Sequence, residues 1–408
     1  MIRLAITLML SALPVLGYAV EPAKERAHAI EEALEVAREQ SIAMAEVLKK
    51  RGDGQLPRST RRNGALRTCS PDDWVSGFYP GVLWYLYENF ETEDLKTYAR
   101  EFTAVLEQEK YHRGDHDIGF IIFCSFGNGY RLTGDPDYRE VIKVACTTLS
   151  KRFDSTIGSI RSWDFGRGRL WNYPVIIDNM MNLEMLLWGG EAFDEGRFTR
   201  IATKHADRTL QNHFREDASS YHLVSYHDDG SVELKRTWQG YRDDSSWARG
   251  QAWGLYGFVM MYRFTENPVY LEKAIRIADF IIDHPNLPDD KVPYWDFDAP
   301  DIPNAPRDAS AGAIICSALL ELSRYTEGEK ATRFLQTAEA QIDALCSPAY
   351  LAEPGANQHF ILKHSVGHLP KDSEVDVPLI YADYYFVEAL TRYKKWTLAG
   401  VGESSGSQ

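Results

Sequence analysis

The sequence predicts an all-α protein that folds as an (α/α)6 barrel, a double ring of about twelve helices arranged as six hairpins. Helical periodicity dominates the 408 residues, and no stretch requires a large β-sheet. Apolar helical segments alternate with amphipathic ones, and turn signals separate them. An open array of helical repeats has the same local pattern, but the strongly apolar character of every second helix favours closure into a ring.

The amphipathic helices are expected on the outside of the ring. Apolar residues recur at helical spacing from Ile30 to Leu48, from Ile142 to Phe153 and from Leu271 to Ile281, with charged residues on the opposite face. One short hairpin of strands is expected from Val224 to Lys235, with Asp228-Asp229-Gly230 as its turn.

The inner helices are expected to be buried on most sides, because they are rich in Gly, Ala, Ser and aromatic residues and carry little charge. Their predicted ranges are 77–89, 117–132, 178–189, 249–264, 309–325 and 377–393. In a ring wound with one hand, the starts of all six lie on one rim, where helix N-termini collect partial positive charge. That rim suits an anionic sugar.

The N-terminus has the features of a secretory signal over residues 1–19. Arg3 gives a basic start, residues 4–16 are apolar but too short to span a bilayer, and Gly17-Tyr18-Ala19 places small residues at the cleavage point. Residues 20–400 are expected to form a single barrel domain, and the Gly/Ser-rich residues 401–408 a disordered tail. We therefore expect a periplasmic or secreted protein without membrane contact after cleavage.

Composition excludes several classes of function. The net charge of −14 argues against nucleic-acid binding. The five cysteines fit neither a zinc site nor a disulfide framework, so we expect them to be packing residues. No phosphate-binding loop, dinucleotide fingerprint or serine-nucleophile elbow is present, and neither a metal nor a cofactor is expected. The oligomeric state stays open.

Two aspartates begin inner helices at equivalent points of the repeat. Asp117 lies in HDIGF (116–120) and Asp178 in IDNMM (177–181). Two carboxylates that face each other across a cavity suit acid/base chemistry on a sugar. The alternative is that each is a helix N-cap, which would lower its pKa, whereas burial beside a second carboxylate would raise it. The sequence leaves this balance open.

A dense polar and aromatic block follows at Trp238–Tyr241 and Ser246–Gly254. Arg249 can form a forked pair with a carboxylate, and Trp247 and Trp253 can stack on sugar faces. The alternative is a structural Arg249 paired with Asp243 or Asp244 between core tryptophans.

Several histidines lie in predicted loops, but no cysteine or carboxylate spacing supports a metal site. His222 and His364 are the two expected to reach the rim. A small anion site is expected from Ser365, Gly367, His368 and Lys371.

Five segments together resemble the unsaturated glucuronyl hydrolases of glycoside hydrolase family 88. They are DWVSGFYPGVLW (73–84), HDIGF (116–120), GNGYRL (127–132), IDNMMN (177–182) and WARGQAWG (247–254). The resemblance implies an (α/α)6 barrel without a metal, which removes the 4,5-unsaturated uronic acid that a polysaccharide lyase leaves at a non-reducing end. It implies that Asp178 is the general acid/base and Asp117 the second essential carboxylate. Residues that match pocket positions are Trp74, His116, Gln239, Trp247, Arg249, Trp253 and, less closely, His222.

Three rival functions stay open from the sequence. An unsaturated rhamnogalacturonyl hydrolase shares the fold and the chemistry. An inverting glycosidase on the same barrel would act on saturated chains, and a non-catalytic sugar-binding protein would keep only the aromatic pocket. The sequence does not identify the polysaccharide that supplies the substrate or its sulfation.

Overall fold

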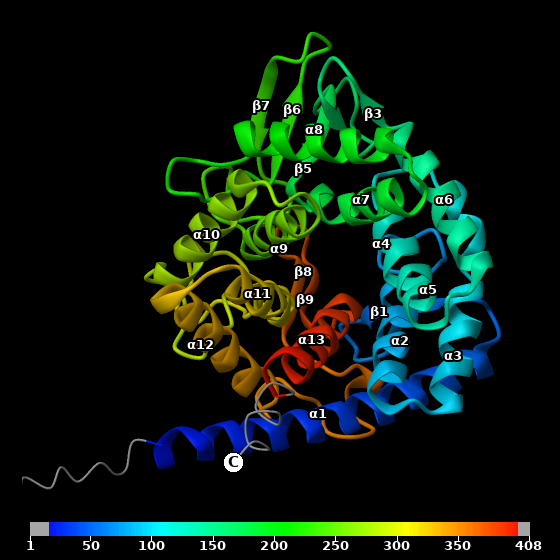
Figure 1. Cartoon of the computed structure of the whole chain (residues 1–408), viewed down its shortest axis with the longest axis vertical. Helices are drawn as coiled ribbons and strands as arrows, with labels where there is room; N and C mark the ends of the chain where they lie inside the picture. The colour runs from blue at the N-terminus through cyan, green and yellow to red at the C-terminus, as the bar shows by residue number, and fades with distance from the viewer. Residues whose placement is uncertain (1–15, 399–408) are drawn as a thin grey trace, which may run out of the picture.

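A double ring of helices forms the protein, as predicted (Figure 1). The computed structural model describes residues 16–398, with side chains from residue 23 onward. The inner helices are α2 (Phe78–Phe90), α4 and α5 (Ile118–Ile122 and Asn128–Thr133), α7 (Leu183–Ala192), α9 (Ala248–Thr265), α11 (Ala309–Leu322) and α13 (Ile380–Tyr393). The outer helices are α1 (Leu16–Arg51), α3 (Glu93–Ala104), α6 (Pro136–Ser150), α8 (Gly196–Asn212), α10 (Pro268–Asp283) and α12 (Gly328–Leu345).

The inner ring closes on itself. Helix α13 packs against both α2 and α11, α9 packs against α11 and α7, and the α4–α5 segment joins α7 to α2. Every residue from Ala248 to Met261 in α9 is buried, which explains the low charge of these helices. The turns between pairs carry ordinary start signals: Asp135 and Asn267 cap α6 and α10, and each is followed by a proline.

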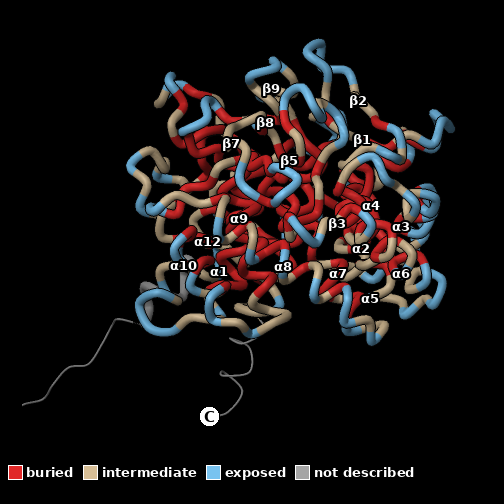
Figure 2. Tube along the Cα trace, turned by 90° about the horizontal axis from the view of Figure 1, so that it is seen from above, coloured by how far each residue is buried: buried red, intermediate tan, exposed pale blue. Residues whose placement is uncertain are grey.

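Short antiparallel strands supply the remaining regular structure. They are β1 and β2 (Leu56–Thr60, Leu66–Cys69), β3 and β4 (Phe153–Asp154, Ser159–Ile160), β5 to β7 (Tyr173–Ile176, Leu223–Tyr226, Val232–Arg236), and β8 and β9 (Ser365–His368, Ser373–Val377). The predicted hairpin is therefore confirmed as β6 and β7. In the view turned by 90°, β1, β2, β8 and β9 gather at one end of the barrel (Figure 2). Loops and strands thus cover the rim where the inner helices begin.

Three predicted inner helices differ in detail from the structure. The range 117–132 is divided by a π-helical segment, η2 (Phe123–Gly127), where Ser125 Oγ donates to the Ile121 carbonyl at 2.6 Å. The range 178–189 begins as a 3-10 helix, η3 (Ile177–Asn182). Helix α13 begins at Ile380 rather than at residue 377, because Pro378 disfavours helical backbone in the residue before it.

The cysteines of the described residues are all free, and all but Cys346 are buried, as expected for packing residues. Within residues 16–398, no helix has the length and apolar character needed to cross a membrane. Most of the predicted signal segment and the whole predicted tail lie outside the described residues.

Candidate active site

Asp117 and Asp178 lie at the starts of adjacent inner segments, which contact each other as α4 and η3. Both side chains are largely buried, and the charge of Asp178 acts on Asp117. Asp117 occupies the N-cap position of α4, but its side chain makes no capping hydrogen bond. Asp178 Oδ2 has no hydrogen-bond partner among the described residues. The capping alternative is therefore wrong for Asp117, and one oxygen of Asp178 is not engaged by the fold.

The environment raises the pKa of both carboxyl groups. Burial raises the pKa of Asp178 to about 7, although the nearby Arg249 guanidinium acts in the opposite direction. Burial, followed by the negative charges of Asp115 and Asp178, holds the pKa of Asp117 well above its usual range. An acid with a pKa near neutrality can both give and take a proton at physiological pH, so Asp178 has the property required of a general acid/base.

His222 faces Asp178 as a neutral hydrogen-bond donor. Its Nδ1 accepts the backbone N–H groups of Trp238 at 2.9 Å and Gln239 at 3.3 Å, so the ring proton resides on Nε2. Nε2 lies 3.6 Å from Asp178 Oδ2. Burial lowers the pKa of His222 well below its usual range, which keeps the ring uncharged. The loop backbone therefore fixes the tautomer that points a proton at the carboxyl group.

His116 stands beside the second carboxyl group. Its Nε2 lies 3.4 Å from Asp117 Oδ1, and the ring is fully buried. Burial lowers the pKa of His116 to about 4, although the charge of Asp115 opposes this. The predicted site residue His116 therefore lies beside Asp117, and His222 lies beside Asp178.

Arg249 is paired with Asp308, not with Asp243 or Asp244 as the structural alternative expected. Its Nη1 lies 3.0 Å from Asp308 Oδ2 and also donates to the Val366 carbonyl, and Nη2 donates to the Gly367 carbonyl at 2.7 Å. Both terminal nitrogens of Arg249 therefore have partners within the described residues, and contact with a substrate carboxylate stays a prediction. Arg249 fixes the backbone of β8 beside Asp178.

Two of the three predicted tryptophans, Trp247 and Trp253, lie at this centre. The Trp247 ring lies 4.6 Å from the His222 ring and 4.5 Å from the Arg249 guanidinium carbon. Trp253 Nε1 is close enough to Asp178 to lower its pKa, but makes no hydrogen bond of ordinary geometry. Trp74 packs against Phe120, with ring centroids 5.8 Å apart.

The C-terminal loop residues are divided between two places. Ser365 is buried in β8, and Lys371 lies over the Trp238 ring, 3.9 Å from its centroid. Gln239 Nε2 donates to the Gly367 carbonyl at 3.2 Å and so belongs to the same wall as Arg249. His364 does not join the aspartates: it is exposed, and its Nδ1 lies 2.6 Å from Asp376 Oδ1.

The structure adds residues that the sequence did not single out. Asn182 lies within the quoted IDNMMN segment, and its Nδ2 donates to Asp117 Oδ1 at 3.4 Å while its Oδ1 accepts the Phe120 N–H at 3.0 Å. A Cβ added at Gly119 would come within 2.9 Å of the Asn182 side chain, so this glycine makes room for the amide. Asp308, the partner of Arg249, also caps α11 by accepting the Ser310 N–H.

An aromatic wall extends from His222 toward the surface. Trp163 lies 6.1 Å from the His222 ring and stacks on the exposed Phe165 at 4.9 Å. Trp171 and Trp238 complete the cluster, with ring centroids 5.3 Å apart. Sugar CH faces pack well on such rings, so the wall suits a substrate that continues outward from the aspartates.

Several known proteins are similar to this chain over most of its length. The profile of the family described as Glycosyl Hydrolase Family 88 matches residues 55–401. The chain is 47% identical over 324 residues to an unsaturated glucuronyl hydrolase of Formosa agariphila, covering 78% of this chain and 80% of that protein. It is 30% identical over 352 residues to an unsaturated chondroitin disaccharide hydrolase of Streptococcus agalactiae, covering 84% and 87%. A solved unsaturated glucuronyl hydrolase specific for heparin shares 45% identity and a TM-score of 0.86, covering 90% of this chain and 97% of that one. The resemblance predicted from the sequence is confirmed, and the chain belongs to glycoside hydrolase family 88.

Proposed function

We propose that this glycoside hydrolase removes a 4,5-unsaturated uronic acid from the non-reducing end of lyase-generated oligosaccharides. The observation that carries the proposal is Asp178: a buried carboxyl group with a pKa near 7 and an unengaged oxygen, next to a neutral His222 donor. A solved aspartate-to-asparagine variant of the Streptococcus agalactiae enzyme holds dGlcA-GalNAc6S, a ligand that begins with such a sugar.

The chemistry follows from the enol ether in the substrate. Protonated Asp178 gives its proton to C4, the C4=C5 π electrons form the new C–H bond, and positive charge develops at C5 and the ring oxygen. Water attacks C5 and loses a proton to the Asp178 carboxylate, which restores the acid. The hemiketal then opens at the C5–O5 bond, and the hemiacetal left at C1 releases the remaining sugar. Asp117 orients the sugar hydroxyls or stabilises the developing charge.

A panel of disaccharides tests the proposal. The enzyme is incubated with lyase products of heparin-type, chondroitin and pectin chains. At least one product from a glucuronyl-containing chain should lose the ultraviolet absorbance of the conjugated enoate. Matched saturated disaccharides should stay intact, because they have no C4=C5 bond to protonate. Release of the terminal sugar from the saturated compounds would instead favour the inverting glycosidase. Preference for the pectin product would favour the unsaturated rhamnogalacturonyl hydrolase.

The pH dependence should follow the titration of Asp178. Because its pKa is raised to about 7, the proton-donating form is present below pH 7 and is lost above it. We expect kcat/KM to fall roughly tenfold per pH unit on the alkaline side, with an apparent pKa of about 7. Initial rates at low substrate concentration measure this directly. A flat profile from about pH 6 to pH 9 would contradict the assignment.

Asn182 is a positioning residue for Asp117. Asn182→Ala removes the amide that links Asp117 to the Phe120 N–H, so kcat should fall by roughly 10–100-fold with a smaller change in KM. A merely structural role would lower stability without changing the pH profile, whereas loss of a donor to Asp117 Oδ1 should move the profile. Asn128→Ala is the matched control, since Asn128 is also buried and its Nδ2 donates to the Tyr384 hydroxyl rather than to Asp117.

We also propose that the chain is exported through a signal segment at residues 1–19. The support is the basic start and the short apolar stretch of the sequence. N-terminal sequencing of the protein recovered outside the cytoplasm should begin after Ala19, and a cytoplasmic chain that keeps its first residues would contradict this.

A further inference from the structure

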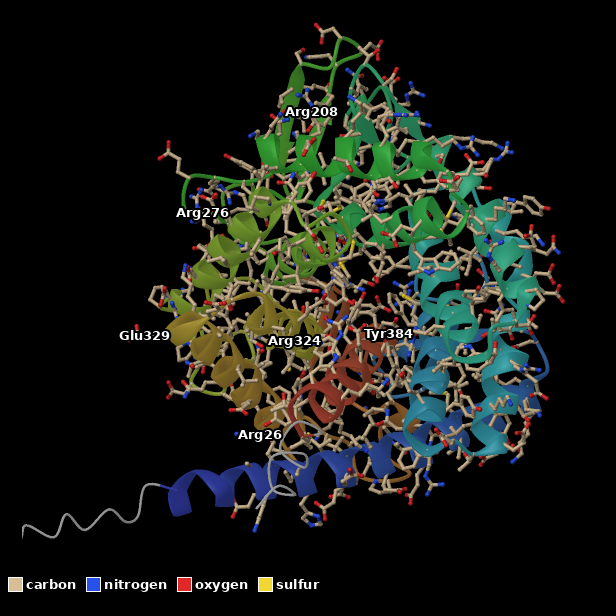
Figure 3. All side chains as sticks on the ribbon, in the orientation of Figure 1. Arg26, Arg208, Arg276, Arg324, Glu329 and Tyr384 are labelled. Atoms are coloured by element: carbon tan, nitrogen blue, oxygen red, sulfur yellow. The ribbon has the colours of Figure 1, made fainter. Side chains whose placement is uncertain are left out.

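A cavity opens at the end of the barrel away from the aspartates. Its volume is about 400 Å³, and it is lined by residues near the C-terminal ends of inner helices, including Arg131 of α5, Arg263 of α9 and Arg392 of α13. The two aspartates lie at the opposite ends of inner segments, Asp117 just before α4 and Asp178 in η3. Tyr384, another lining residue, lies near the centre of the inner ring (Figure 3). We call this hollow the far-end cavity.

A layer of aromatic rings separates the far-end cavity from the catalytic centre. Phe120 and Tyr385 line the cavity, and both pack against Trp253, with ring centroids 5.3 Å and 5.4 Å away. Trp253 belongs to the surroundings of Asp178. A ligand in the far-end cavity would therefore contact the back of this layer without touching the aspartates.

The charges that line the cavity are compensated by one another. Arg263 lies 2.8 Å from both Glu184 and Glu321, and Arg392 lies 3.2 Å from Glu321 and 3.3 Å from Glu388. At the mouth, Arg131 is paired with Glu88 at 2.6 Å. Because each arginine has a carboxylate partner, the cavity does not present the excess positive charge that an anion requires.

Two features of the lining point to a ligand that is both polar and flat-faced. Arg263 and Glu184 line the cavity with side chains that stay 30% and 22% exposed, so both present polar groups to a ligand. The rings of Tyr130, Trp188 and Phe264 line the cavity and are only partly buried. Rings beside fixed hydrogen-bonding groups are the combination that holds a sugar, whose CH groups stack while its hydroxyls bond.

We propose that the far-end cavity is a second, non-catalytic site that binds a neutral sugar unit. The paired charges disfavour a uronate or sulfate, and the ionised side chains disfavour an apolar ligand. The volume lies in the range of ordinary ligand sites and accommodates a single sugar with its waters. This inference does not depend on the proposed activity, because it uses none of the catalytic residues.

Fluorine NMR of the whole chain labelled with 5-fluorotryptophan tests the site. The conservative variants Trp188→Phe and Trp163→Phe identify one resonance in the far-end cavity and one on the catalytic side. Glucose and N-acetylglucosamine should each shift the Trp188 resonance saturably, with a Kd of roughly millimolar size, and glucuronate should bind at least about tenfold more weakly. The Trp188 response should persist in Asp178→Asn protein saturated with an unsaturated disaccharide, which shifts the Trp163 resonance instead.

Three outcomes would overturn the proposal. They are a Trp188 resonance that no neutral sugar moves, a response that the disaccharide abolishes, and tighter binding of glucuronate than of both neutral sugars. Trp188→Ala, checked for native circular dichroism, should weaken binding of N-acetylglucosamine by at least about tenfold in calorimetry. If this variant does not fold, the labelled unsubstituted chain still decides the question.

Discussion

Asp178→Asn should lower kcat by at least about 10³-fold while substrate binding stays measurable. The amide has nearly the shape of the protonated carboxyl group, but it can neither protonate C4 nor accept the proton of the attacking water. His222 Nε2 keeps a hydrogen-bond acceptor opposite it, so the pocket should stay intact. Turnover is measured by loss of enoate absorbance, and binding by calorimetry with the intact disaccharide. Near-normal kcat in this variant would exclude Asp178 as the acid/base.

The stability of the same variant, relative to that of the unsubstituted protein, should increase as the pH rises. Between about pH 4 and pH 7 the folded protein keeps a proton that the unfolded chain has already lost, so the unsubstituted protein loses stability across this window as the pH rises, and the loss is complete above pH 7. Asparagine removes this cost, which is at most roughly 4 kcal/mol. The difference in Tm between the variant and the unsubstituted protein should therefore be larger at about pH 9 than at about pH 5.

Asp383 offers a matched control, because a raised pKa alone does not identify a catalytic group. Burial raises the pKa of Asp383 to about 8, yet its two oxygens accept the backbone N–H groups of Ile361 and Leu362 at 3.0 Å and 2.8 Å. The Asp383 carboxyl group therefore fixes the backbone of the loop that contains Ile361 and Leu362. Asp383→Asn should lower stability but leave kcat within about threefold. An equal loss of kcat in Asp178→Asn and Asp383→Asn would mean that replacing any buried carboxyl group lowers kcat, and would remove the support for Asp178 as the acid/base.

The parts of this structure that follow from local sequence were predictable. Alternation of apolar and amphipathic helices fixes which helices lie inside, and the starts of the inner helices place Asp117 and Asp178 on one rim. The 3-10 and π-helical segments were not predictable, because they depend on packing around Asp178 and Ser125 rather than on periodicity.

Long-range partners were also beyond the sequence. Arg249 was expected to pair with a near neighbour or a substrate, but it meets Asp308 and the β8 backbone, which the fold brings from far along the chain. The tautomer of His222 likewise depends on the backbone N–H groups of Trp238 and Gln239, whose approach to the ring is set by the fold. His364 was placed on the rim by its position in a loop, whereas its pairing with Asp376 turns it toward solvent.

Arg249→Ala should have the largest effect on stability. The arginine and Asp308 side chains are only 1% and 0% exposed, so removal of the guanidinium leaves an unpaired carboxylate in the interior. Breaking a buried pair in this way costs about 3–5 kcal/mol. The matched control is Arg333→Ala, because Arg333 is 37% exposed and pairs with Asp279 and Asp283 on the surface. It should cost less than about 1 kcal/mol. Urea denaturation followed by circular dichroism measures both.

The catalytic effect of Arg249→Ala should appear in the pH profile as well as in the rate. Arg249 lowers the pKa of Asp178, so its loss should move the alkaline limb of kcat/KM to higher pH. Without the guanidinium, the Val366 and Gly367 carbonyls lose these donors and β8 is no longer held in place, so kcat/KM should fall by at least about 100-fold. Arg249→Lys keeps the charge but loses the fork, so it should retain the alkaline limb while recovering only part of the rate. If the alanine variant lost stability but kept the original pH profile, Arg249 would support the fold alone and not the acid.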